Sequence, residues 1–150
     1  MNDDPALQNY KKIVVGYDGS DNSKRALERA IALSAFEGAT LRIVVAVNTI
    51  LPMYGTTAPY YPPDYAEQVT KEGQRSLAEA VSRAKQVTQK ISGSVMDGHP
   101  AEMILSSADR DGSDLIVVGR RGISGVERFL MGSVSSSVVN HSKCDVLIVK

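Results

Sequence analysis

The residues best suited to chemistry in this chain form a run of glycines, hydroxyls and arginines in its last third. The run extends from Val118 to Ser133, after the apolar stretch 115–118, which is typical of a buried strand. A helical pattern over 132–141 follows. A strand that leads through a glycine-containing loop into a helix favours anion binding, because the first N–H groups of a helix lack partners and carry partial positive charge.

Several residues of this run could contribute to such a site. Gly119 and Gly122 allow the backbone to approach a ligand closely, and Gly132 gives access to the helix N-terminus. The hydroxyls of Ser133 and Ser135 fall in the first helical turn, where they could donate to phosphate oxygens. The run also contains positive charge, carried by Arg120, Arg121 and Arg128.

A simpler reading of the same residues is an ordinary loop between a strand and a helix. Ser133 would then be a plain N-cap, and the arginines would form a solvated surface. The residues alone leave both readings open.

Composition and missing motifs exclude several classes of protein. The 150 residues include 17 Lys+Arg and 17 Asp+Glu, so the chain lacks the basic excess typical of nucleic-acid binders. A single cysteine, Cys144, excludes an intramolecular disulfide and is expected to be buried as a small hydrophobe. His99 and His141 lack metal-ligand spacing, and His141 suits a helix C-terminus. The P-loop and dinucleotide fingerprints are missing.

The sequence also predicts a cytoplasmic protein. Its longest apolar run, 43–47, has five residues, whereas a membrane span needs about 20. The N-terminus lacks the cationic flank and apolar core of a secretory signal.

Apolar runs and helical patterns alternate along the chain. Expected strands are 13–16, 41–47, 91–96, 115–118 and 146–149, and expected helices are 23–37, 64–90, 100–111 and 132–141. Ser20 or Asp21 should cap the first helix, which Gly38 should end. Continuous apolar strands that alternate with helices predict a parallel sheet covered on both faces. We therefore expect one doubly wound α/β domain over 1–150, with a polar lead-in (1–9) and an irregular segment (48–64).

The glycine run resembles a motif of the universal stress protein family. The ATP-binding branch of that family carries G-x2-G-x9-G-[ST], and Gly119, Gly122, Gly132 and Ser133 match this spacing without a gap. The stretch 13–20 resembles the first strand and turn of the family, and 98–104 resembles its G-x-P-A-x-x-I. The stretch 141–144 resembles its ending, although Asp145 stands where the family usually has proline.

The resemblance implies a Rossmann-like sheet of five parallel strands in the order 3-2-1-4-5. It places ATP at the carboxyl ends of strands one and four, a topological switch point of the kind where open α/β sheets bind ligands. It also implies a homodimer formed through the terminal strand, Val146–Val149.

The resemblance further implies roles for individual residues. Asp18 would face the adenosine, and Val47 would contact adenine, partly through its backbone. Alternatively, Asp18 only forms a turn and Val47 only packs in the core. The expected nucleotide-binding residues are Gly16, Tyr17, Asp18, Val47, Val118, Gly119, Arg120, Gly122, Gly132, Ser133, Val134 and Ser135. Mg²⁺ could bridge the phosphates with few protein ligands.

The expected function is that of an ATP-binding regulatory module of the stress response. We expect that the protein is not an enzyme and that it hydrolyses ATP at most weakly, because the sequence indicates no residue that could act as the catalytic base. The alternatives are a slow ATPase, a signalling protein that binds cyclic AMP or AMP, and an interaction scaffold with an empty crevice. Expected partners are an adenine nucleotide, a second copy and an unknown regulatory protein, but neither nucleic acid nor a membrane. The segment 48–64 would be a lid, a partner surface or a disordered loop.

Overall fold

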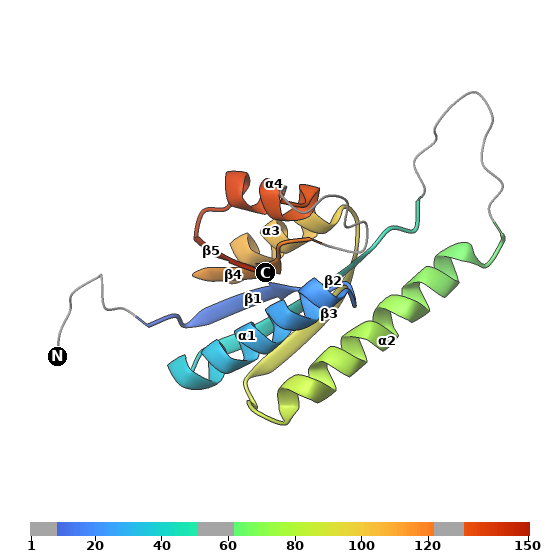
Figure 1. Cartoon of the computed structure of the whole chain (residues 1–150). Coiled ribbons are helices and arrows are strands. Elements are labelled where there is room, and N and C mark those ends of the chain that lie inside the picture. Colours follow the sequence, from blue (N-terminus) through green and yellow to red (C-terminus); the bar gives the residue numbers. More distant parts are fainter. Residues whose placement is uncertain (1–8, 51–61, 122–130) are drawn as a thin grey trace.

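The computed structural model describes residues 9–50, 62–121 and 131–150, in which five strands alternate with four helices (Figure 1). The strands are β1 (Lys12–Gly16), β2 (Thr40–Val47), β3 (Ile91–Asp97), β4 (Leu115–Gly119) and β5 (Asp145–Val149). The helices are α1 (Asp21–Glu37), α2 (Tyr65–Lys85), α3 (Pro100–Asp111) and α4 (Ser133–His141). The alternation expected from the apolar pattern is confirmed.

All strand pairs are parallel, and the strand order is β3-β2-β1-β4-β5. The predicted order is therefore confirmed. β1 is central, with β2 on one side and β4 on the other, so the chain reverses its direction of travel across the sheet after β3. This reversal brings the carboxyl ends of β1 and β4 together, although about a hundred residues separate them in the sequence.

The core has one layer on each face of the sheet. Because side chains alternate along a strand, Ile13 and Val15 of β1 face α1 and α2, whereas Val14 faces α3 and α4. Figure 1 shows the two helix pairs on opposite sides of the sheet. All three β1 residues are at most 1% exposed, as expected for a parallel sheet covered on both faces.

The helix ends follow the expected chemistry. Ser20 caps α1, because its Oγ accepts a hydrogen bond of 3.2 Å from the Ser23 N–H. Gly38 ends α1 with a φ of 70°, a left-handed conformation that glycine adopts without strain. Pro100 is the first residue of α3, where its missing N–H costs no hydrogen bond.

The second helix is shorter than expected. It ends at Lys85 instead of about residue 90, and β3 begins at Ile91. The N–H groups of Val87 and Thr88 both donate to the Ala84 carbonyl oxygen, which closes a turn. Residues 86–90 therefore reverse the chain, a requirement that helical periodicity does not reveal.

The residues before and at the start of β5 make polar contacts or are only partly buried. Asp145 accepts a 3.0 Å hydrogen bond from the Tyr10 hydroxyl, which also raises the pKa of Tyr10. Cys144 packs against the α3–α4 layer but is only half-buried, because it precedes the edge strand. His141 lies in the last turn of α4, with Nδ1 2.8 Å from the Ser137 carbonyl oxygen.

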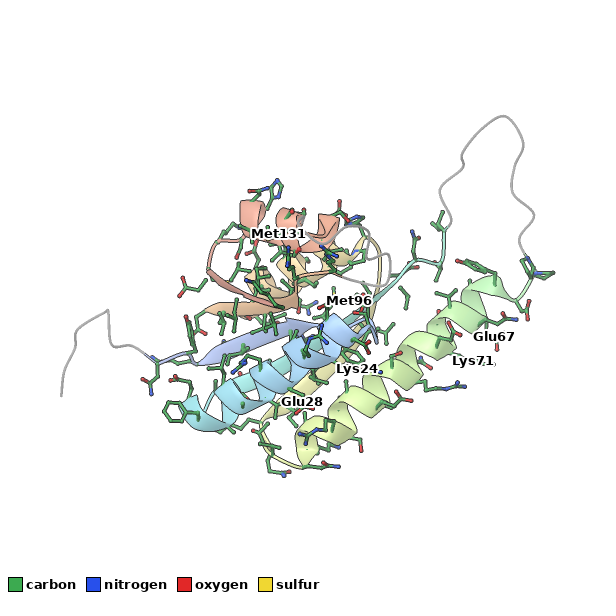
Figure 2. All side chains as sticks on the ribbon, viewed as in Figure 1. Lys24, Glu28, Glu67, Lys71, Met96 and Met131 are labelled. Atoms are coloured by element: carbon green, nitrogen blue, oxygen red, sulfur yellow. The ribbon has the colours of Figure 1, made fainter. Side chains whose placement is uncertain are left out.

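The outer surface of α2 is polar. Glu67 and Lys71, one turn apart near its start, form an exposed ion pair of 2.7 Å (Figure 2). Among the helices in the described ranges, none has the length and apolar character required for crossing a membrane.

Gly73 provides a test of how closely α2 approaches the sheet. A Cβ at this position would lie 2.5 Å from Val47 Cγ1 and 3.1 Å from Val95 Cγ1. We expect Gly73→Ala to lower the free energy of unfolding by about 1–3 kcal/mol, because β-branched neighbours move little. Urea denaturation followed by circular dichroism measures the change.

Ala78, which is exposed on the same helix, provides the control. Ala78→Gly should cost only the helix-propensity difference of about 1 kcal/mol. If Gly73→Ala instead raised stability by a similar amount, the close packing of α2 on β2 would be disproved.

Candidate functional site

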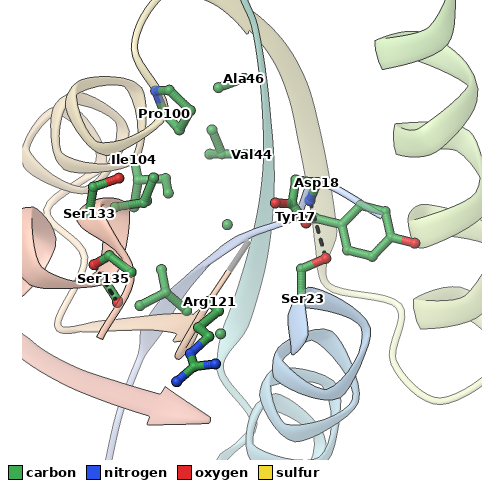
Figure 3. A pocket seen from close by; sticks show the side chains of 15 residues that line it. Tyr17, Asp18, Ser23, Val44, Ala46, Pro100, Ile104, Arg121, Ser133 and Ser135 are labelled. Carbon is green, nitrogen blue, oxygen red and sulfur yellow. Dashed lines mark hydrogen bonds between the residues drawn. The ribbon is translucent and has the colours of Figure 1, made fainter. Parts of the chain in front are cut away.

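A cavity of about 350 Å³ lies at the carboxyl ends of β1 and β4 (Figure 3). Loops, strand ends and the first turns of three helices surround it. Its lining residues are Gly16, Tyr17, Asp18, Ser23, Val44, Ala46, Pro100, Ile104, Val118, Gly119, Arg121, Gly132, Ser133, Val134 and Ser135. The turn at Asp18 and the described glycines of the run, Gly119 and Gly132, therefore lie in one crevice.

The N-terminus of α4 supplies hydrogen-bond donors on one side of the cavity. Its N-cap, Gly132, has extended backbone angles and no side chain, so no side-chain cap occupies the first N–H groups. α1 differs, because Ser20 caps it. Ser133 is exposed at the cavity, which leaves its hydroxyl accessible. The first turn of α4 thus has the geometry of an anion site.

A set of hydrogen bonds fixes this end of α4. The Gly132 N–H donates to the Arg120 carbonyl oxygen at 2.9 Å, and the buried Ser135 Oγ donates to the same oxygen at 2.9 Å. The Arg120 N–H donates to the Val149 carbonyl oxygen at 2.8 Å. Ser135 therefore positions the helix end, and Arg120 contributes its backbone and does not line the cavity.

Asp18 forms the turn after β1 and also lines the cavity. Its Oδ1 accepts from the Ser20 N–H at 2.9 Å, and its own N–H donates to Ser23 Oγ at 3.3 Å. The carboxyl group is exposed at the cavity, so turn formation and ligand contact are compatible.

Tyr17 contributes its backbone to the cavity. Figure 3 shows its ring pointing toward α2, away from Ile104 and Pro100. The side chain is 7% exposed in the core between the sheet, α1 and α2. Burial is the main reason that the pKa of Tyr17 is raised, and nearby Glu79 and Asp18 raise it further.

An apolar wall lies on the α3 side of the cavity. Val44 and Ala46 come from β2, and Pro100 and Ile104 come from α3 (Figure 3). The side chain of Val47 does not belong to this wall. Its Cγ1 lies where a Cβ on Gly73 would clash, on the α2 face of the sheet.

A close backbone approach joins the floor of the cavity to α1. A Cβ on Gly119 would lie 2.8–2.9 Å from the backbone and Cβ of Asn22. Only glycine fits at this position without displacing the first turn of α1. Gly119 thus matters for packing as well as for access to the cavity.

Most of the residues expected to bind the nucleotide line this cavity, and some lining residues were not expected. Gly122 and Arg128 lie outside the described residues. The lining residues that the sequence did not indicate are Ser23, Val44, Ala46, Pro100 and Ile104, and Arg121 was expected only to add positive charge to its segment. Strand alternation could have placed Val44 and Ala46 on the α3 face, and the G-x-P-A-x-x-I stretch contains Pro100 and Ile104.

The charge of the lining is nearly balanced. Among the described lining residues, Arg121 carries one positive charge and Asp18 carries one negative charge. The described part of the chain contains no group of three or more His, Cys, Asp or Glu side chains that could hold a metal ion.

The sequence profile of the universal stress protein family matches residues 9–150. This chain belongs to the universal stress protein family. It is 36% identical to Universal stress protein YxiE of Bacillus subtilis over 147 residues, which cover 94% of this chain and 99% of the relative.

Two solved structures of the family are complexes with a nucleotide. A universal stress protein in complex with cAMP is 35% identical to this chain, covers 95% of it over 98% of its own length, and has a TM-score of 0.71. A universal stress protein from Archaeoglobus fulgidus in complex with dAMP is 25% identical, covers 95% of this chain over its full length, and has a TM-score of 0.66.

The ends of β2 and β3 beside the cavity are joined through Asp97. Its carboxyl group accepts from the Thr49 hydroxyl and, at 3.1 Å, from the Thr49 N–H. The hydroxyl contributes most to a lowered pKa of Asp97, and the backbone bond adds to it. These bonds hold the residues that follow β2 against the end of β3.

We expect NMR titration to give Asp97 a pKa below its ordinary value. Thr49→Val should raise it toward that value, because the hydroxyl donor is lost while the N–H remains. A lowered folded-state pKa means that this stabilisation is present above the unfolded pKa and disappears as the pH falls through the folded pKa. The part of the stability difference that depends on the ionised Asp97 carboxylate should therefore disappear as the pH falls.

Thr40→Val at the amino end of β2 is the matched control and should leave the Asp97 pKa unchanged. An Asp97 pKa unaffected by Thr49→Val would show that the hydroxyl does not bond to the carboxylate.

Proposed function

We propose that this chain binds an adenine nucleotide, with ATP as the ligand, and acts as a regulatory module in the stress response. The observation that carries the proposal is the cavity at the ends of β1 and β4, where the uncapped N-terminus of α4 faces an apolar wall. A nucleotide needs both features, because its base is apolar and planar whereas its phosphates are anionic.

The orientation that we propose for the ligand matches the two sides of the cavity. The base lies against Val44, Ala46 and Ile104, and the phosphates lie at the first turn of α4. Asp18 lies at the mouth of the cavity, where its carboxylate can accept from ribose hydroxyls. Mg²⁺ would be held mainly by the phosphates, with Asp18 as the one carboxylate among the described lining residues.

Cyclic AMP or AMP is the second candidate ligand. Only one guanidinium, that of Arg121, is among the described lining residues, and a ligand with one or two charges needs less compensation than a triphosphate. The relatives with cAMP and dAMP support this alternative.

Binding without efficient turnover is the proposed mode of action. Phosphoryl transfer to water requires a positioned base or water-orienting group and stabilisation of charge in the transition state. Asp18, the one carboxylate in the described lining, already accepts the Ser20 N–H. We therefore propose that the protein responds to nucleotide occupancy and is not an enzyme, with at most weak hydrolysis.

Calorimetric titration with ATP, AMP, cyclic AMP and GTP tests the proposal. Adenine nucleotides should bind and GTP should bind more weakly, and mass spectrometry of the denatured protein would identify any nucleotide that it retains. Failure of every adenine nucleotide to bind at millimolar concentration would disprove the proposed function. Steady-state ATP hydrolysis at about 1 s⁻¹ would show an ordinary enzyme instead.

Ser133→Glu separates nucleotide binding from folding. A carboxylate in the first turn of α4 stabilises the helix by about 0.3–1 kcal/mol, but it repels phosphate. We expect stability to be kept or raised while nucleotide affinity falls by about tenfold or more, which corresponds to at least about 1.4 kcal/mol. Calorimetry and thermal denaturation measure the two effects.

Ser106→Glu, an exposed change on α3, is the matched control and should leave affinity unchanged. If the Ser133→Glu protein bound nucleotide with the same affinity as the unaltered protein, the phosphates would not lie at the N-terminus of α4.

We also propose that the chain forms a homodimer through its terminal strand. β5 is an edge strand, and its apolar residues 146–149 leave one row of backbone groups available for pairing. The Val149 carbonyl oxygen accepts the Arg120 N–H at 2.8 Å, so the backbone groups of Val149 face β4. Because alternate residues of a parallel strand face opposite neighbours, the N–H of Ile148 points to the free edge. A second copy would complete this edge by symmetric pairing.

Sedimentation should give twice the mass of the chain, and Ile148→Pro should shift the protein toward monomer by removing an outward N–H. Far-UV circular dichroism checks that the variant stays folded. A monomeric mass for the unaltered protein at micromolar concentration would refute the dimer.

A further inference from the structure

A second groove, of about 440 Å³, lies between α1 and the end of β5. Basic side chains from Lys24, Arg25, Arg29 and Lys150 surround it, and Ala32 and Val149 supply its apolar lining. The binding cavity described above does not use this groove.

Among the lining residues of this groove, four side chains are basic and one is acidic. The acidic side chain, Glu28, is bound by Arg83 of α2 through two hydrogen bonds of 2.6 and 2.7 Å, so both of its carboxylate oxygens are occupied. Figure 2 places Lys24 and Glu28 on α1. Across the ranges that the structure describes, Lys24 and Arg29 form no ion pair. Arg25 and Arg29 lie one turn apart, where like charges cost stability.

Hydrogen bonds fix one wall of the groove. Arg25 Nε donates to the Lys150 carbonyl oxygen at 3.0 Å, and Arg25 Nη2 donates to Asn22 Oδ1 at 2.6 Å. The guanidinium therefore holds the end of β5 against the first turn of α1. The fold therefore fixes the position of Arg25 in this wall of the groove.

We propose that this groove docks an acidic peptide segment of a partner protein. An apolar side chain of the segment lies against Ala32 and Val149, and flanking carboxylates pair with Lys24 and Arg29. Polynucleotide fits less well, because the positive charge is confined to one groove of a chain with no net charge.

The groove and the cavity share the first turn of α1. Ser23 lines the cavity and Lys24 lines the groove, while Gly119 of the cavity pairs with Val149 of the groove. A partner bound here contacts the elements that hold the nucleotide site. The docking surface itself stands on its own residues, and it is tested on nucleotide-free protein.

The probe is a fluorescein-labelled peptide with the sequence Gly-Glu-Glu-Val-Glu-Glu-Gly, titrated against the full chain by fluorescence anisotropy. We expect binding that weakens as salt rises, and about tenfold weaker binding of the same peptide with Gln in place of Glu. Amide NMR shifts should change at Ala32 and Val149. Lys24→Glu with Arg29→Glu should weaken binding by about tenfold or more.

Arg75→Glu with Lys85→Glu, which alters two exposed cations on α2, is the matched control and should leave binding unchanged. No binding of the acidic peptide at millimolar concentration, or equal binding by the charge-reversed protein, would overturn the proposal. Changes in amide NMR shifts that are confined to surfaces outside the groove would also overturn the proposal. A change of oligomeric state on charge reversal, without loss of peptide binding, would assign the groove to contact between copies.

Discussion

The parallel pairing of β1 with β4 is the constraint on which the site depends. The chain builds outward from β1 through β2 and β3, then returns to the other side of β1 with β4 and β5. The helices that follow β1 and β4 cross to opposite faces of the sheet, so their first turns separate as they leave it. The space between them is the cavity, and it exists because of the strand order, before any particular side chain is considered.

Backbone groups form one side of the cavity, and apolar side chains form the other. The side of the cavity that has the geometry of an anion site depends on the N–H groups of α4, which Gly132 leaves uncapped, and on Ser135, which holds the helix end to the Arg120 carbonyl oxygen. The apolar side depends on residues that also belong to the core, such as Val44 and Ile104. A chain with no net charge can therefore provide a site for an anion without a cluster of cations.

The sequence predicts the strand and helix order well because burial on both faces leaves uninterrupted apolar runs, and because Ser20, Gly38 and Pro100 mark helix ends. The lining of the cavity is harder to predict. Val44 and Val47 look alike in sequence, and only the facing of β2 decides that one borders the cavity while the other packs on Gly73. The end of α2 was also missed, because the length needed to turn back into β3 is a tertiary requirement.

The arginines after β4 also show what the sequence does not predict. Arg120 and Arg121 are adjacent, yet Arg121 lines the cavity while Arg120 is tied through its backbone to β5 and α4. The sequence indicates the segment that contains both arginines and its positive charge. It could not choose between neighbours, because that choice depends on how the chain leaves β4.

The contacts of Tyr10 and Arg25 have a consequence for how copies of the chain can associate. Tyr10 holds the first residue of β5 through Asp145, and Arg25 holds the residue that follows β5 through the Lys150 carbonyl oxygen. Exchange of an identical element between molecules is a low-cost route to dimers. Here both ends of the strand are fastened to the body of its own chain. Exchange must break both fastenings before the strand can leave, so the fold disfavours strand swapping.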